Sequence, residues 1–150
     1  MNVVLHQPEI PQNTGNIGRT CVATGAKLWL IRPLGFRVDD QRMRRAGLDY
    51  WQHLDIEIVD SWTAFMEQHA TARLWFSTKT AERVYTDVKF QRDDFLVFGS
   101  ETRGLPPSIL AQGDSTLRIP QSDNVRSLNL SNSVAIAVYE GLRQLDCRDV

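Results

Sequence analysis

The chain has 150 residues, 42% of them hydrophobic, which is enough to bury one core, so we expect a single domain over residues 1–150. No stretch approaches the roughly 20 consecutive apolar residues of a membrane helix, and the first residues do not resemble a signal peptide. We therefore expect a cytoplasmic protein with no membrane partner. The net charge of −1 excludes a general attraction to nucleic acid, so any contact with RNA must come from local groups of arginine.

Six short runs rich in apolar and β-branched residues predict strands, and helical patterns lie between most of them. The predicted strands are residues 2–6, 27–32, 56–59, 73–77, 95–98 and 116–119. This alternation favours a mostly parallel sheet with helices on both faces, because a parallel connection needs a crossover long enough for a helix. The predicted fold class is therefore α/β.

Three helices have recognisable ends. The first is predicted to begin near Asn13 or Thr14, either of which can cap it, and to end at Gly25. The second begins at Asp60 or Ser61 and runs to about residue 69. The last begins near Leu130, and its apolar face is wider than one stripe, so we expect it to pack on the sheet and on a second subunit.

Three segments are richer in polar and glycine residues than packing requires, and each lies where α/β proteins place ligands. The first, residues 8–20, places Arg19 and small polar residues at the start of a helix, where free amides favour an anion such as RNA phosphate. The alternative is a capped helix whose glycines allow close packing. These two interpretations remain open.

The second segment, residues 98–106, directly follows an apolar strand and places Gly99 and Gly104 around a charged triplet. Such a loop can bring its backbone close to a ligand. The third segment, residues 119–133, is a polar loop that enters the last helix, and its Asn129, Ser131 and Asn132 can bind a heterocyclic ligand, cap the helix, or do both.

Together the three segments resemble the motifs of the knotted SPOUT class of methyltransferases, in particular its small subfamily that methylates the wobble nucleotide of transfer RNA. The resemblance covers essentially the whole chain. It implies a parallel sheet whose C-terminal part forms a trefoil knot, a homodimer, and S-adenosylmethionine as methyl donor without a metal. The expected reaction is methyl transfer to the ribose 2′-hydroxyl of the wobble cytidine or uridine in the tRNA anticodon stem-loop.

The resemblance also assigns residues to the site. It implies that the donor is held by the strand end at Ser77, Thr78 and Lys79, by the glycine loop and by the third segment. The donor-binding residues are expected to be Ser77, Thr78, Gly99, Ser100, Glu101, Gly104, Ile119, Ser127 and Leu128. The implied catalytic group is Arg19, acting across the dimer as base or as phosphate ligand, and its expected supports are Asn13, Glu101, Asn129 and Ser131.

RNA is expected to contact Arg19 and a cluster formed by Arg42, Arg44 and Arg45. The cluster can instead be an exposed helix face paired with neighbouring aspartates. Phe36, Tyr50 and Trp51 flank it and can stack on a splayed base or pack in the core.

The isolated cysteines, Cys21 and Cys147, have no metal-ligand spacing, so we expect two reduced thiols and no metal site.

Two other functions share these features. One is a related 2′-O-methyltransferase acting on ribosomal RNA. The other is a non-catalytic RNA-binding dimer that retains the donor pocket.

Overall fold

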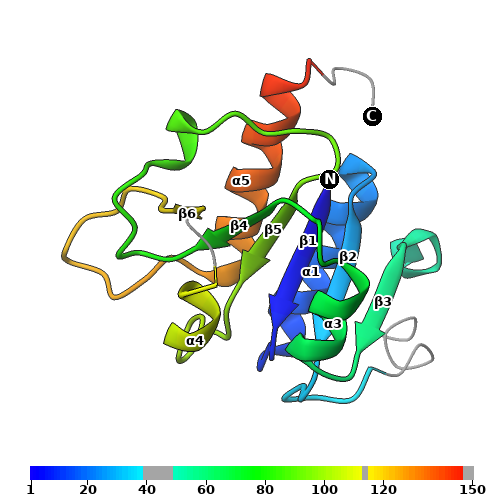
Figure 1. Ribbon diagram of the computed structural model, residues 1–150. Helices are drawn as coiled ribbons and strands as arrows, with labels where there is room; N and C mark the ends of the chain where they lie inside the picture. The colour runs from blue at the N-terminus through cyan, green and yellow to red at the C-terminus, as the bar shows by residue number, and fades with distance from the viewer. Residues whose placement is uncertain (39–48, 113–114, 147–150) are drawn as a thin grey trace.

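The computed structural model describes residues 1–38, 49–112 and 115–146, and all of its named strands join one parallel sheet (Figure 1). The strand order is β3-β2-β1-β5-β4-β6. The strands are β1 (Asn2–His6), β2 (Lys27–Ile31), β3 (Ile56–Val59), β4 (Leu74–Ser77), β5 (Phe95–Phe98) and β6 (Thr116–Leu117). The α/β class with a parallel sheet is therefore confirmed, and each strand overlaps its predicted range.

Helices cover both faces of the sheet, as the sequence predicted (Figure 1). The helices are α1 (Pro11–Thr24), α3 (Trp62–Gln68), α4 (Pro107–Leu110) and α5 (Leu130–Gln144), with the 3₁₀ turns η1 (Asp49–His53) and η2 (Tyr85–Asp87). None of the helices in the described ranges is long and apolar enough to cross a membrane.

The alternation of side chains along β1 divides the core into two layers. Val3 and Leu5 pack with residues of α1 and α5, whereas Val4 packs on the other face with Phe65 of α3 and Ile109 of α4. Both faces of the central strands are therefore buried, which explains their continuous apolar sequences.

The predicted cap of the first helix is wrong, and the helix begins two residues before Asn13. Helix α1 begins at Pro11 after Ile10, which makes no side-chain cap, and neither Asn13 nor Thr14 lies at the cap position. Proline presets the backbone for the first helical position, and the amide of Ile10 donates to the Glu101 carboxylate at 3.2 Å. The start of α1 thus receives its hydrogen-bond acceptor from a distant loop. The predicted end at Gly25 is confirmed.

The other two helix starts agree with the sequence. The Ser61 hydroxyl accepts a hydrogen bond from the Ala64 amide at the start of α3. The Asn129 side chain accepts from the amides of Ser131 and Asn132 at the start of α5. Capping by Asn129 is therefore part of its role.

Strand β6 is shorter than predicted. It ends at Leu117, because the chain then turns to the segment beyond β4, where the Arg118 amide donates to the Arg83 carbonyl at 2.9 Å. Ile119 lies beyond the strand and lines a cavity.

Candidate functional site

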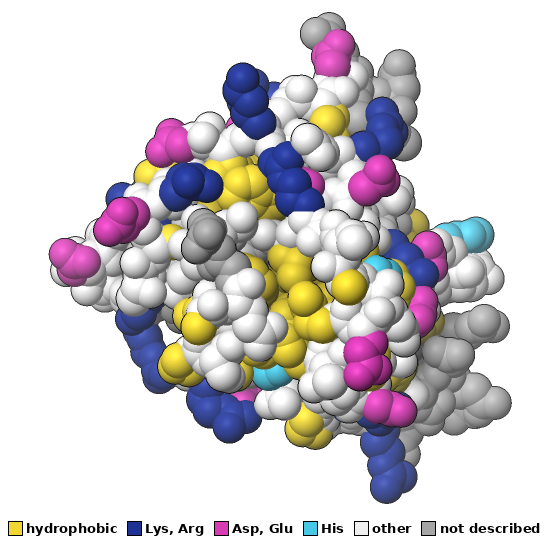
Figure 2. Space-filling model, viewed as in Figure 1, with side chains coloured by type: hydrophobic (Ala, Val, Ile, Leu, Met, Phe, Trp, Pro, Cys, Tyr) yellow, Lys and Arg dark blue, Asp and Glu magenta, His cyan; other side chains and the backbone are white. Residues whose placement is uncertain are grey.

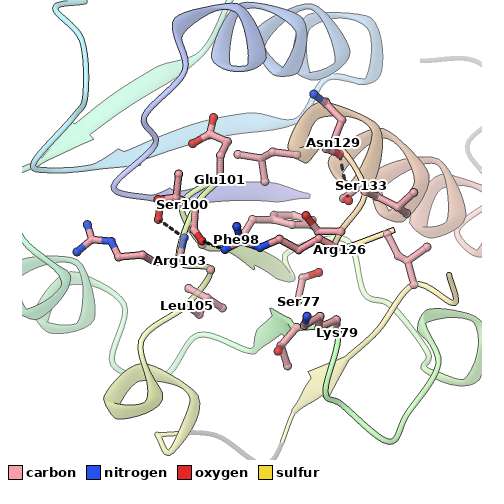
Figure 3. Close-up of a pocket in the computed structure, with 18 of the residues that line it drawn as sticks. Ser77, Lys79, Phe98, Ser100, Glu101, Arg103, Leu105, Arg126, Asn129 and Ser133 are labelled. Atoms are coloured by element: carbon pink, nitrogen blue, oxygen red, sulfur yellow. Dashed lines mark hydrogen bonds between the residues drawn. The ribbon is translucent and has the colours of Figure 1, made fainter. Parts of the chain in front are cut away.

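A cavity of about 510 Å³ lies at the carboxyl ends of β4 and β5 and at the start of α5 (Figure 3). Three separate parts of the chain form most of its wall: residues 77–80 after β4, the loop 98–105 after β5, and residues 119–133. In Figure 3, Ser77 and Lys79 lie on one side of the cavity, Ser100 and Glu101 on another, and Asn129 near the start of α5. The three segments singled out from the sequence thus contribute very unequally. From the first segment, residues 8–20, only Ile10 and Asn13 reach this wall.

All nine residues expected to hold the methyl donor line this one cavity. They are Ser77, Thr78, Gly99, Ser100, Glu101, Gly104, Ile119, Ser127 and Leu128. A cavity of this size fits a ligand as large as a nucleoside derivative. Apolar side chains of Phe98, Leu105 and Leu128 alternate with polar groups in the wall, which suits a partly apolar heterocycle carrying polar substituents.

The loop after β5 folds back on itself. The Gly104 amide donates to the Ser100 carbonyl at 2.9 Å, and Gly104 has a φ of +68°. A Cβ added to Gly99 would fall well inside van der Waals distance of the Gly104 backbone, so the two chain segments can approach this closely only at glycine. The loop therefore presents its main chain to the cavity.

Four of the five predicted catalytic residues form one chain of hydrogen bonds beside the cavity. The Asn13 amide group donates to Glu101 Oε1 at 3.0 Å, and Asn129 Nδ2 donates to Asn13 Oδ1 at 3.0 Å. Asn129 Oδ1 in turn accepts from the Ser131 hydroxyl at 2.6 Å. This chain joins all three segments and fixes α1, the glycine loop and α5 relative to one another.

Arg19 lies apart from this chain. It is exposed on α1 and does not line this cavity, and its guanidinium carbon lies 4.7 Å from the centre of the Tyr50 ring. Asn13 and Arg19 are six residues apart on one helix, which separates them by roughly 9 Å along its axis. The described chain by itself therefore does not bring Arg19 together with the residues that line the cavity.

The sequence analysis gave no role to Glu9, which lies at the cavity rim. Its carboxylate accepts from the Thr102 amide at 3.1 Å and from the Thr102 hydroxyl at 2.7 Å. Glu101 accepts in return from the Glu9 amide at 2.8 Å. The only sequence signal for Glu9 was an acidic side chain within the first polar segment. Its role could not be predicted, because its partner Thr102 is 93 residues away.

The other residues considered for RNA contact divide into two groups. Arg42, Arg44 and Arg45 lie outside the described residues. Trp51 is buried and packs close to Gly18, so of its two predicted roles it has the core one. Phe36 and Tyr50 are half-buried, and Tyr50 contacts Arg19.

Among the residues that the structure describes, the cavity wall contains no cysteine. Cys21 is buried in α1, and burial raises the pKa of its thiol to about 12, so it stays protonated and unreactive. Cys147 lies outside the described residues. Within the described ranges, no three His, Cys, Asp or Glu side chains are grouped so that they could hold a metal ion.

The comparisons with known proteins agree with this geometry. Residues 1–139 match the family described as the SpoU rRNA methylase family. A tRNA (cytidine(34)-2'-O)-methyltransferase from Saccharophagus degradans is 50% identical over 146 residues, which are 96% of this chain and 95% of the relative.

Two solved structures share the fold. One, described as giving insight into the 2-OH methylation of C/U34 on tRNA, has a TM-score of 0.91 and 47% identity over 98% of this chain and 97% of its own. The other, the SpoU methyltransferase AviRb from Streptomyces viridochromogenes in complex with AdoMet, has a TM-score of 0.84 and 25% identity over 97% of this chain and 58% of its own. The resemblance inferred from the three motifs is thereby confirmed, and the chain belongs to the SpoU methylase family.

Proposed function

We propose that this protein transfers a methyl group from S-adenosylmethionine to the ribose 2′-hydroxyl of the wobble nucleotide, cytidine or uridine 34, of transfer RNA. The observation that carries the proposal is the single cavity lined by three distant segments, in a chain whose relatives of nearly equal length are named for this reaction. The AdoMet-bound relative supports the choice of donor.

The residues around the cavity fit such a donor. The main chain of the glycine loop and the backbone near Leu128 would grip its adenosine, while Ser77 and Thr78 offer hydroxyl groups at the opposite wall. When bound, the donor supplies a methyl group on a positively charged sulfur, which an incoming oxygen displaces in line. The chain's own contribution is to position the two reactants and to exclude water.

The ribose hydroxyl must lose its proton during transfer, and Arg19 is the residue we place beside it. An arginine side chain is protonated under ordinary conditions, so it serves better to bind the adjacent phosphate and orient the hydroxyl than to accept the proton. The chain of Glu101, Asn13, Asn129 and Ser131 holds the cavity wall against which the nucleotide lies.

We propose that the site is completed by a second subunit. Arg19 does not line its own subunit's cavity, and α5 exposes Tyr139 to 53% while Ile10 is 41% exposed beside the cavity. Covering these apolar side chains with a second copy would bring the partner's α1 to the donor.

The RNA would be held locally and not by an overall positive field. Figure 2 shows basic and acidic side chains interspersed around a hydrophobic centre on one face of the molecule. Contacts with the anticodon stem-loop would then come from Arg19 and from Arg42, Arg44 and Arg45. Donor and transfer RNA both occur in the cytoplasm, where we place the reaction.

We also propose that the chain is one domain with a C-terminal knot. Residues between β4 and β5 are held by two later parts of the chain: the Tyr85 amide donates to Arg118, and Gln144 donates to the Val88 carbonyl at 3.0 Å. Contacts of one segment with two later parts of the chain suit a loop through which the chain has passed. A single cooperative unfolding transition would agree with one domain.

The function is tested by incubating the protein with isotopically labelled S-adenosylmethionine and total RNA, then digesting the RNA to nucleosides. Labelled 2′-O-methylcytidine or 2′-O-methyluridine at position 34 of transfer RNA is the expected result. Label in ribosomal RNA alone would favour the ribosomal alternative. No transfer, together with retained donor and RNA binding, would favour the non-catalytic dimer.

A further inference from the structure

The turn η1 packs its aromatic residues against α1 at the level of Arg19. A Cβ added to Gly18 would come within 3.1 Å of both Trp51 of η1 and Leu54, the first residue after η1, so the backbone of α1 is in close contact with this segment. Tyr50 lies next to Trp51 and is packed on the same core. Gly18, the residue before Arg19, thus allows η1 to pack closely against α1.

Tyr50 contacts α1 at two points. Its hydroxyl donates a hydrogen bond of 2.6 Å to the carbonyl of Gly15, and the face of its ring lies 4.7 Å from the Arg19 guanidinium carbon. Gly15 is four residues before Arg19, one helical turn away on the same face. The hydroxyl therefore fixes the ring, and the ring contacts the guanidinium.

Arg19 needs such support because it is long and exposed. A free arginine side chain populates many rotamers and loses rotamer entropy when it is fixed. No carboxylate in the described parts of the chain forms an ion pair with it. An aromatic face attracts a guanidinium without neutralising it, so the charge stays available for a phosphate.

We propose that Tyr50 is a positioning residue that presents the Arg19 guanidinium for methyl transfer, with its hydroxyl anchored on Gly15. The inference rests on the proposed role of Arg19 in the reaction. It also explains why Tyr50 would not be free to stack on an RNA base, which was the other role considered for it.

The first test is a double-mutant cycle read out as single-turnover methyl transfer at saturating donor and transfer RNA. Tyr50→Leu should slow transfer by about 10-fold, while Tyr50→Phe, which keeps the ring but loses the hydroxyl that holds it on Gly15, should slow transfer by the smaller factor of about 3. In an Arg19→Ala background, Tyr50→Leu should have no further effect. The same fold loss in both backgrounds, or equal loss for Leu and Phe, would overturn the proposal.

Substrate affinity separates positioning from direct RNA contact. Tyr50 does not line the donor cavity, so Tyr50→Leu should leave the Kd for S-adenosylhomocysteine unchanged within about 2-fold. A higher KM for transfer RNA with an unchanged rate at saturation would assign Tyr50 to base stacking and overturn the proposal.

Leu54→Val is the matched control for loosened packing of η1. Leu54 packs against Gly18, as Trp51 does, whereas the aromatic ring that lies over the Arg19 guanidinium is that of Tyr50. Leu54→Val should lower the thermal midpoint of unfolding and leave the single-turnover rate within about 2-fold of that of the unmodified protein. A rate loss as large as that of Tyr50→Leu would show that η1 packing alone matters and would overturn the proposal.

A spectroscopic measurement tests the contact without RNA. The ring face should shift the Arg19 side-chain proton resonances upfield, and this shift should persist in Tyr50→Phe and vanish in Tyr50→Leu. An unmodified protein that shows the shift but transfers no methyl group to transfer RNA would refute the proposed function alone. An active protein without the shift would refute the positioning role alone.

Discussion

Two glutamates exchange hydrogen bonds across the rim of the cavity. Glu101 accepts from the backbone amides of Glu9 and Ile10, and Glu9 accepts from the amide and hydroxyl of Thr102. The Glu101 carboxylate thus accepts from the segment that contains Glu9, and the Glu9 carboxylate accepts from the loop that contains Glu101. Hydrogen bonds to a charged group contribute about 1.5–3 kcal/mol each, so this pair ties the glycine loop to the start of α1.

Removing one partner should loosen the loop. Glu9→Ala is expected to weaken binding of S-adenosylhomocysteine by about 10-fold, as measured by calorimetry, because Thr102 loses its acceptor and the loop loses its fixed shape. Glu67→Ala, an exposed glutamate on α3, is the matched control and should leave binding unchanged. Unchanged affinity in Glu9→Ala would mean that the loop holds its shape without this contact.

His6, at the carboxyl end of β1, makes stability depend on pH. Burial, with a smaller contribution from the positive charge of Arg103, lowers the pKa of His6. The unfolded chain then binds more protons than the folded one below pH 6.5, so stability should fall as the pH falls below that value.

Urea unfolding between pH 7.5 and 5.5 checks this expectation. The midpoint should decrease across this range, and His6→Gln should remove part of the decrease, leaving the part due to His69, whose pKa burial also lowers. His53→Gln, an exposed histidine on η1, should leave the slope as it is. An identical slope in His6→Gln would rule out this origin.

Among the elements, the loop after β5 depends on glycine for two different reasons. Gly99 is required because the Gly104 backbone occupies the space of a side chain, whereas Gly104 adopts a left-handed conformation with open space around it. Gly25 resembles Gly104, since it ends α1 at a φ of +64° with nothing within 4 Å of an added Cβ. A glycine required by lack of space, Gly99, can therefore be compared with one required by its left-handed backbone, Gly25, within one chain.

Gly99→Ala and Gly25→Ala should separate these two needs. Gly25→Ala is expected to cost about 1 kcal/mol of stability and to leave donor binding intact. Gly99→Ala should displace the loop and weaken binding of S-adenosylhomocysteine by at least about 10-fold. Calorimetry together with thermal unfolding makes the comparison, and retained affinity in Gly99→Ala would show that the loop adapts.

The N-terminal starts of α1, α3 and α5 differ in how well the local sequence predicts them. Ser61 and Asn129 cap helices within their own local sequence, and both were found there. The start of α1 was misplaced because its acceptor is Glu101, 91 residues from Ile10. Local capping rules cannot identify a partner that only the tertiary structure supplies.

For the whole molecule, the separation of Arg19 from its own cavity predicts that catalysis needs two subunits. A mixture of Arg19→Ala chains with Ser77→Phe chains, whose added ring would fill the donor cavity, should regain activity. Random pairing in a twofold dimer leaves one intact site in half of the dimers, so about a quarter of the unmodified activity should return. Each variant alone should be inactive.

The measurement is methyl transfer after the two variants are coexpressed and purified together. Recovery requires that Arg19 of one chain serves the cavity of the other, because in a self-contained subunit every site would carry one of the two changes. Absence of recovery in verified mixed dimers would place Arg19 and the cavity in the same subunit.

The sequence by itself determined the α/β class, the parallel sheet and the set of residues around the cavity. The first two follow from local regularities, because buried parallel strands are continuously apolar and alternate with helices. The positions of the ligand-binding loops follow from the glycine and polar residues at the strand ends. The nine cavity residues came from a family resemblance carried by those same loops, and they lie together.

The tertiary structure alone decided which of these residues act on one another. The strand order β3-β2-β1-β5-β4-β6, the exchange between Glu9 and Glu101, and the contact of Tyr50 with Arg19 join residues that are far apart in the chain. Hydrogen bonds and ring contacts act over a few ångströms in space, and pattern along a sequence does not specify which distant partner lies within that range.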